Sequence, residues 1–150
     1  MDKKRIIIIL LIIICILLSC ILYQTFLSPK ANYVTSIDNV TFNTTFKTDF
    51  KLHNETEGWK YYLSETKDER YTLSICDSDT IGNELFYLLN CPSQTINGIV
   101  IYTGTANTGQ HIGEPTYVAV IENKDIGKGV KIGSSDPKET AKMASSLKFS

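Results

Sequence analysis

The chain has 150 residues and a formal net charge of −1, which allows one folded domain beside a short additional segment. Its charge is unevenly placed, because Lys3, Lys4 and Arg5 open the chain and no charged residue follows until Lys30. Residues 28–150 hold 12 Lys and Arg against 15 Asp and Glu, which argues against nucleic acid as a partner, since nucleic-acid binding needs clustered basic residues.

Residues 6–27 form one uncharged segment that is dominated by Ile and Leu. A helix needs roughly 20 apolar residues to cross the hydrocarbon layer, so we expect a transmembrane anchor with the lipid bilayer as its partner. Basic residues favour the cytoplasmic side of such a helix. The sequence therefore predicts a single-pass protein of the cell membrane, with residues 1–5 in the cytoplasm and the C-terminal domain extracellular.

Two other fates of this segment stay open. The residues from Leu17 to Cys20 are similar to a bacterial lipobox, in which Cys20 would be lipidated, although the apolar run continues past that cysteine. A cleaved signal peptide has a shorter apolar region followed by an A-x-A-like site, and no such site follows here. All three fates place residues 31–150 outside the cytoplasm.

A polar segment with a proline, residues 28–36, is predicted to be a tether to an extracytoplasmic domain of residues 37–150. Val40 and Phe42 alternate with polar residues, which indicates a half-buried strand. Alternating aromatic and aliphatic residues on either side of a charged turn predict a β-hairpin over residues 58–65 and 70–77.

The following part of the chain combines one helical pattern with further strands. Residues 81–90 are predicted to form a short helix, capped by Asp79 or Thr80, with Leu85, Leu88 and Leu89 on one face. Asn97 and Gly98 suit a type I′ turn between strands. Beyond that turn, we expect a strand over 99–104, a loop over 105–115, and strands over 117–122 and 130–134.

The strongest local signal lies near the C-terminus. Asp136 is placed to be a helix N-cap, Pro137 the first helical residue, and Glu139 the residue whose side chain reaches back to the cap. Thr140, Ala144 and Leu147 then share one helical face. The predicted class is therefore α+β, an N-terminal transmembrane helix followed by a mostly antiparallel β-sheet with helices on one side, the C-terminal helix packed on the sheet.

The stretch from Tyr117 to Phe149 also carries a resemblance, in the segments YVAVIENKD and VKIGSSDPKETAKMASSLKF. It resembles the ending of an uncharacterised family of small archaeal, methanogen-type proteins that have a single N-terminal membrane helix. The ING-IVIY and GEP-Y segments are similar as well, so the resemblance covers about the last third of the chain. More distantly, the strand–strand–helix ending is similar to the PsbP/Mog1-like fold. The resemblance implies a membrane anchor and a fold but no activity.

Cys76 and Cys91 are the two cysteines outside the predicted anchor. An extracytoplasmic location permits a disulfide between them, which would contribute about 3 kcal/mol in the chain-entropy model. Two buried free thiols are the alternative.

Asn39, Asn43 and Asn54 each begin an N-glycosylation sequon. Because the three sequons are clustered in a region predicted to be extracytoplasmic, we expect that at least one could be occupied.

Residues typical of catalytic or metal sites are sparse. His53 and His111 are not in a zinc-binding spacing and are interpreted as exposed loop residues. The run from Asp77 to Glu84 does not fit a calcium loop and is better explained by helix capping. Residues 104–113 are rich in Gly but precede a strand, so they favour a β–β connection, and this loop is the leading place to look for ligand contacts.

These patterns predict a binding or structural module of the cell envelope, without catalytic residues, cofactor or metal. Its expected partner is a protein of the envelope or the membrane. Two alternatives are an extracytoplasmic enzyme acting on envelope polymers and an accessory or sensor subunit of a membrane complex. The first alternative requires converging Asp, Glu or His side chains in a cleft. The second requires a membrane partner.

Overall fold

The computed structural model describes residues 3–23 and 32–150, and the chain divides into two compact units, Met1–Ala31 and Asn32–Ser150. The first unit contains helix α1 (Lys3–Leu22), which is long and apolar enough to cross a membrane. The predicted apolar helix is thus confirmed as far as Leu22, whereas residues 24–27 of the expected span lie outside the described residues.

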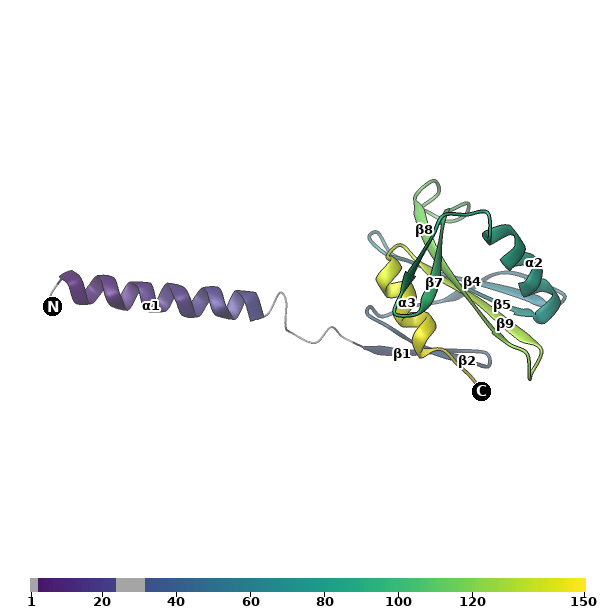
Figure 1. Ribbon diagram of the computed structural model, residues 1–150, viewed down its shortest axis with the longest axis horizontal. Coiled ribbons are helices and arrows are strands. Elements are labelled where there is room, and N and C mark those ends of the chain that lie inside the picture. The colour runs from purple at the N-terminus through teal and green to yellow at the C-terminus, as the bar shows by residue number, and fades with distance from the viewer. Residues whose placement is uncertain (1–2, 24–31) are drawn as a thin grey trace. The chain divides into compact units, whose positions relative to one another are not determined.

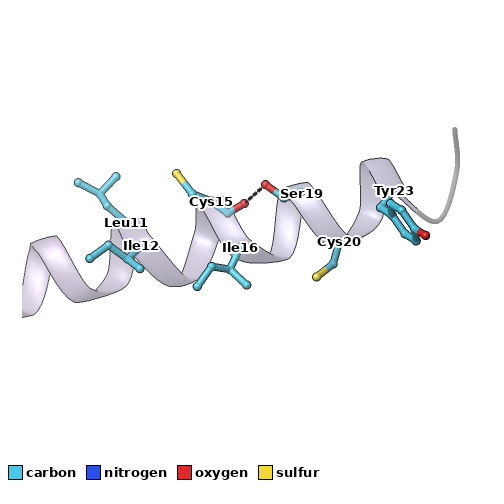
Figure 2. A pocket seen from close by; sticks show the side chains of 7 residues that line it. All are labelled: Leu11, Ile12, Cys15, Ile16, Ser19, Cys20 and Tyr23. Carbon is cyan, nitrogen blue, oxygen red and sulfur yellow. Dashed lines mark hydrogen bonds between the residues drawn. The ribbon is translucent and has the colours of Figure 1, made fainter. Parts of the chain in front are cut away.

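The described side chains of α1 are exposed along its whole length. Figure 2 draws some of those in its C-terminal half, from Leu11 onward. Ser19 donates a hydrogen bond from Oγ to the Cys15 carbonyl oxygen one turn earlier, at 2.8 Å. This bond satisfies the hydroxyl within the helix, as a hydrocarbon environment would require of a polar group. Cys20, the residue that the lipoprotein alternative would modify, lies inside the same uninterrupted helix.

The second unit consists of two antiparallel sheets and two helices (Figure 1). The smaller sheet has the strand order β1-β2-β10 and the larger one the order β3-β4-β5-β9-β8-β7-β6. The strands are β1 (Tyr33–Ile37), β2 (Val40–Thr44), β3 (Lys51–Thr56), β4 (Trp59–Glu65), β5 (Arg70–Asp77), β6 (Ser93–Ile96), β7 (Ile99–Thr105), β8 (Pro115–Asn123), β9 (Lys128–Ser134) and β10 (Lys148–Phe149), and the helices are α2 (Ser78–Leu88) and α3 (Pro137–Ser146).

The tether prediction is wrong at its C-terminal end. Residues 33–36 belong to β1, which pairs in register with β2 from Tyr33 opposite Thr44 to Ile37 opposite Val40. The Tyr-Val-Thr run has high strand propensity, and pairing with β2 satisfies its backbone groups. The rest of the predicted tether, residues 28–31, lies outside the described residues.

The hairpins follow the sequence prediction closely. β4 and β5 pair from Glu65 opposite Arg70 to Trp59 opposite Cys76, which confirms the hairpin over 58–65 and 70–77. β6 and β7 are joined at Asn97 and Gly98, with φ of 51° and 80°. Two successive positive φ angles are the geometry of the type I′ turn, which Asn-Gly tolerates best.

The hydrophobic core lies between the large sheet on one side and α3 with the small sheet on the other. Side chains from both sheets and from the helix meet there, and all of them are at most 8 % exposed. Its members are Val40, Phe42, Tyr62, Tyr71, Leu73, Ile75, Ile101, Ala119, Val130, Ile132, Ala141, Met143 and Ala144. The C-terminal helix is therefore packed on the sheet, as predicted.

Helix α3 begins at the expected residue, but the side chain of its third residue, Glu139, does not bond the N-cap. Asp136 accepts a hydrogen bond from Lys138 N at 2.8 Å, and Pro137 is the first helical residue. The carboxylate of Glu139, expected to close a capping box, instead accepts from the backbone N and the Oγ1 of Thr45, each at 2.5 Å. The approach of β2 to the helix supplies these donors, so the predicted reach back to the cap is wrong.

The prediction that the helices share one side of the sheet is wrong for helix α2. It lies on the face of the large sheet opposite α3, because Ile81 packs over Gly129, a position that faces away from the core (Figure 1). A Cβ at Gly129 would come within 2.6 Å of the Ile81 side chain, so only glycine allows this close approach. We call this face the α2 face.

The predicted short helix exists, but it begins earlier, at Ser78, with Asp77 in the N-cap position. Its inward face carries Ile81, Leu85 and Leu88, whereas Leu89, which we expected on that face, is 65 % exposed. The Asp77 side chain makes no capping hydrogen bond and instead accepts from Lys128 Nζ at 2.5 Å.

Candidate functional site

The α2 face is covered at both ends and hollow in the middle. Along β5, the side chains that point to this face are, in order, Arg70, Thr72, Ser74 and Cys76. Helix α2 lies over the Cys76 end, and the loop of residues 106–114 contacts Arg70 at the other end. A pocket of about 420 Å³ remains between them, within the range typical of small-molecule sites.

The pocket draws its lining from β3, β4, β5, β7, β8, β9, α2 and the loop before β8. Most of these residues carry hydroxyl or amide groups, three are aromatic, and two are charged. They are His53, Asn54, Trp59, Tyr61, Thr72, Ser74, Glu84, Leu88, Gly104, Thr105, Asn107, Thr108, Thr116, Val118 and Lys131.

Strand register brings Thr72 and Val118, two residues of the pocket floor, to either side of one glycine. Thr72 on β5 and Val118 on β8 flank Gly133 on β9, which lies opposite both of them. A Cβ at Gly133 would lie 2.8 Å from Thr72 Oγ1 and 2.8 Å from the Tyr117 carbonyl oxygen. Neighbouring atoms therefore cover the backbone at Gly133 closely, and only glycine fits at this position.

Three aromatic side chains on β3 and β4 at one edge of the large sheet, those of His53, Trp59 and Tyr61, form one wall of the pocket, which we call the aromatic wall. The rings of Trp59 and Tyr61 on β4 are parallel, with an interplanar angle of 3° and centroids 5.9 Å apart. The His53 ring on β3 meets Tyr61 edge-on at 5.6 Å. Alternation along β4 places Trp59 and Tyr61 on the same face, which is why they can stack.

Two buried polar atoms at this pocket have no hydrogen-bond partner among the described residues. They are Ser74 Oγ and Trp59 Nε1, and Ser74 is 1 % exposed. A buried hydroxyl or indole N–H without a partner costs about 1–3 kcal/mol, so native proteins rarely leave such groups unsatisfied. Neighbouring atoms cover both groups in this structure, so a bound molecule or water would complete their hydrogen bonding only with a small shift of the pocket lining.

The charged groups of the pocket neutralise each other. Glu84 on α2 forms an ion pair with Lys131 on β9, with the carboxylate Oε2 on the ammonium group. This pair bridges the helix to the sheet above Ser74, which lies opposite Lys131 in the strand register. Next to it, burial raises the pKa of the Cys76 thiol to about 11, so this cysteine is neutral and a poor nucleophile near neutral pH.

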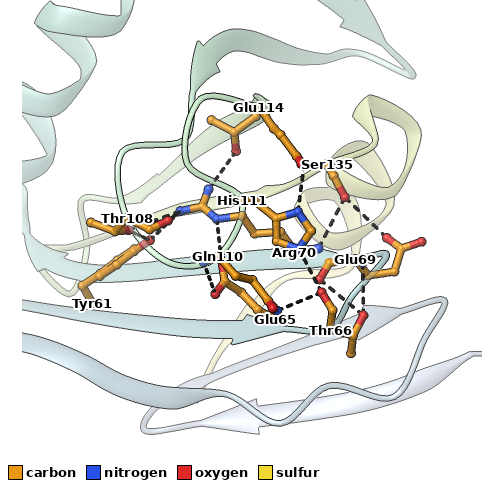
Figure 3. Close-up of polar contacts among 11 residues, drawn as sticks. Tyr61, Glu65, Thr66, Glu69, Arg70, Thr108, Gln110, His111, Glu114 and Ser135 are labelled. Carbon is orange, nitrogen blue, oxygen red and sulfur yellow. Dashed lines mark hydrogen bonds and ion pairs between the residues drawn. The ribbon is translucent and has the colours of Figure 1, made fainter.

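A polar network fixes the loop that forms the far wall (Figure 3). Arg70, 4 % exposed, donates from Nε to Glu65 Oε1 at 3.2 Å and from its NH2 group to the Thr108 carbonyl oxygen at 3.3 Å. The same group reaches Tyr61 Oη at 3.3 Å, which couples the loop to the aromatic wall. The other Glu65 oxygen accepts from Gln110 N at 3.0 Å.

His111 ties the same loop to the turn between β4 and β5 (Figure 3). Its Nε2 lies 2.8 Å from the Thr66 carbonyl oxygen, and its Nδ1 lies 2.8 Å from Glu114 Oε2. Both partners accept hydrogen bonds, so only the doubly protonated ring can donate to both. The Thr66 carbonyl, followed by the Glu114 carboxylate, therefore raises the pKa of His111 above its ordinary value.

We expect His111 to stabilise the domain at acidic pH and to stabilise it less as pH rises. A raised folded-state pKa adds stability that is complete below the unfolded pKa of about 6.5 and is lost as pH rises through the folded value. Denaturant unfolding of the wild type and of His111→Gln between about pH 5 and pH 8 measures the free energy of unfolding of each protein as a function of pH. The difference between the two proteins should shrink toward pH 8, and a difference independent of pH would contradict the assignment.

The predicted Cys76–Cys91 disulfide is not formed, and both residues are free thiols. Cys76 precedes α2 and Cys91 follows it, so the 11-residue helix lies between them along the chain. Such a helix is roughly 16 Å long, whereas the Cα atoms of a disulfide lie about 4.4–6.8 Å apart. Only Cys76 reaches the sheet, where it is 1 % exposed beneath the helix.

The sequons differ in accessibility. Asn54 is exposed on the edge strand β3, where the register with β4 shifts and its own side-chain oxygen accepts from Glu55 N. Asn39 and Asn43 are half-buried, and Asn43 N is bonded to Ser146 Oγ at 2.9 Å. Glycosylation stays a prediction, with Asn54 as its most accessible acceptor.

The histidines were expected in exposed loops, and the structure corrects this for both. His53 is exposed but lies on β3 beside Tyr61, and His111 is in a loop but is 7 % exposed. Within residues 3–23 and 32–150, no group of three or more His, Cys, Asp and Glu side chains could hold a metal ion. Residues 106–114 do form the predicted β–β connection, between β7 and β8.

Sequence reasoning did not identify the floor and wall of the pocket as a site. Thr72, Ser74 and Lys131 look like ordinary strand residues, because their common location depends on pairing between β5 and β9. The one local signal was the alternation of Trp59 and Tyr61, which places two aromatic rings on one strand face.

No family model matches this sequence, and no curated protein matches it either. The resemblance to the archaeal family therefore stays a prediction.

Proposed function

We propose that this protein is a single-pass, membrane-anchored extracytoplasmic binding module of the cell envelope. Helix α1 would hold the folded unit outside the cell, and the pocket between α2 and the 106–114 loop would receive the ligand. Support for the location comes from the apolar helix with its basic leading edge.

One observation carries the binding role: Ser74 Oγ and Trp59 Nε1 are buried at the same pocket without a partner among the described residues. Hydrolysis of envelope polymers is the weaker candidate, because glycoside hydrolysis uses two carboxylates across the scissile bond. Glu84 is the one carboxylate among the described lining residues, and Lys131 engages it.

Cysteine labelling in intact cells tests the topology. In a Cys91→Ser background, Lys124→Cys places a thiol in the exposed turn between β8 and β9, and Asp2→Cys places one before the anchor. A membrane-impermeant maleimide should label the first variant in intact cells and the second only after permeabilisation. The reverse pattern would overturn the proposal, and the mass of the mature protein separates a retained anchor from cleavage or lipidation at Cys20.

A further inference from the structure

We infer that the pocket on the α2 face binds a neutral saccharide, presented by the cell envelope or free in solution. This inference rests on the proposed function and names the ligand class of the same site. Three properties of the lining support it: its charge balance, its hydroxyl and amide groups, and its aromatic wall.

The charge balance disfavours ligands with a net charge. Glu84 and Lys131 pair with each other, so a charged ligand would find a counter-ion only by breaking that pair. Breaking a partly buried ion pair leaves one charge uncompensated, which opposes binding. A neutral ligand leaves the pair in place.

The floor disfavours a purely apolar ligand. Thr105 and Asn107 are exposed and Thr108 and Thr116 are half-buried, so the polar groups of these lining residues meet whatever enters the pocket. An apolar molecule would bury these groups without hydrogen-bond partners, which is costly. A molecule with many hydroxyl groups supplies a donor and an acceptor at each position.

The wall distinguishes a sugar from a planar base. Trp59 and Tyr61 stack on each other, so no slot for a flat ring lies between them. Aromatic ring faces carry partial negative charge and attract the weakly positive C–H groups of a saturated ring. A sugar presents both C–H and hydroxyl groups, which matches a pocket with an aromatic wall and a polar floor.

Trp59 is the one tryptophan of the chain, so its emission reports directly on this pocket. The full-length protein in phospholipid nanodiscs, free of sugar-headed detergent, is titrated with maltose, cellobiose and N,N′-diacetylchitobiose. Parallel titrations use adenosine, glucuronate and alanine. We expect a saturable change in Trp59 emission with at least one neutral disaccharide below about 100 mM, which covers millimolar Kd values.

Variants locate the site. Thr72→Val and Asn107→Ala should each raise the Kd for that disaccharide at least about fivefold, which corresponds to the loss of one hydrogen bond. Asn107 is exposed, so its variant tests the site even where Thr72→Val disturbs folding. Thr95→Val, an exposed position on β6 outside the pocket, is the matched control and should bind as the wild type does.

The outcomes separate the two proposals. A response to adenosine, glucuronate or alanine without one to any disaccharide overturns the saccharide inference and leaves the binding module standing. If none of the six compounds changes Trp59 emission, both the inference and the assignment of this pocket as the binding site are overturned. Equal disaccharide affinity in the wild type and both pocket variants overturns the location of the site.

Discussion

Arg70→Met should lower the free energy of unfolding by about 3–5 kcal/mol, the largest single-residue effect that we expect in this domain. The Arg70 and Glu65 side chains are 5 % and 13 % exposed, so water cannot replace their interaction. Methionine keeps the aliphatic stem but removes the guanidinium group, which leaves the Glu65 carboxylate buried with Gln110 N as its remaining partner within the described chain. Equilibrium unfolding in urea, followed by Trp59 emission, measures the loss.

A double-mutant cycle separates the buried charge from general damage to packing. In the Glu65→Gln background, Arg70→Met should cost substantially less, because no carboxylate is then left uncompensated. The same substitution should speed amide exchange in residues 106–114, whose Thr108 carbonyl loses its donor. A loss below about 1 kcal/mol for Arg70→Met, as is typical of surface pairs, would contradict this account.

The second large effect is expected at Glu139, where Glu139→Ala should cost about 2–4 kcal/mol. The Glu139 carboxylate is buried and accepts from Thr45 N and Thr45 Oγ1, each at 2.5 Å. Alanine removes two charge-assisted hydrogen bonds and leaves the amide of Thr45 without an acceptor. Because Thr45 directly follows β2, the change weakens the attachment of the small sheet to α3.

Two further variants control the Glu139 measurement. Lys138→Ala changes an exposed residue in the same helical turn and should alter the unfolding midpoint only slightly. Glu139→Gln keeps an acceptor oxygen and should fall between the wild type and Glu139→Ala. The account fails where Glu139→Ala unfolds at the same urea concentration as Lys138→Ala.

Arg70 also supports the pocket on the α2 face, although it does not line it. Arg70 contacts Tyr61 and Thr108, which line the pocket, so its network keeps the aromatic wall and the loop at a constant separation. Such a support sets the geometry of a binding site without contacting the ligand. We therefore expect Arg70→Met to weaken the binding of any ligand to the pocket, in addition to destabilising the fold.

The sequence by itself determined the features that depend on neighbouring residues. The apolar helix α1, the hairpin of β4 and β5, the Asn97-Gly98 turn and the start of α3 at Asp136 all arise from patterns within a few residues. Hydrophobic periodicity, turn geometry and helix capping act at that range, which is why these predictions held.

Tertiary structure alone decided everything that depends on pairing between distant segments. Register between β5 and β9 placed Ser74 opposite Lys131, and Gly129, without a side chain, left room for α2 to pack closely on the face opposite α3. The same long-range packing buried His111, kept Cys76 away from Cys91, and turned Glu139 toward Thr45. Strand register and helix placement are set by the packing of the whole core, so no local pattern could predict which side chains would meet in the pocket.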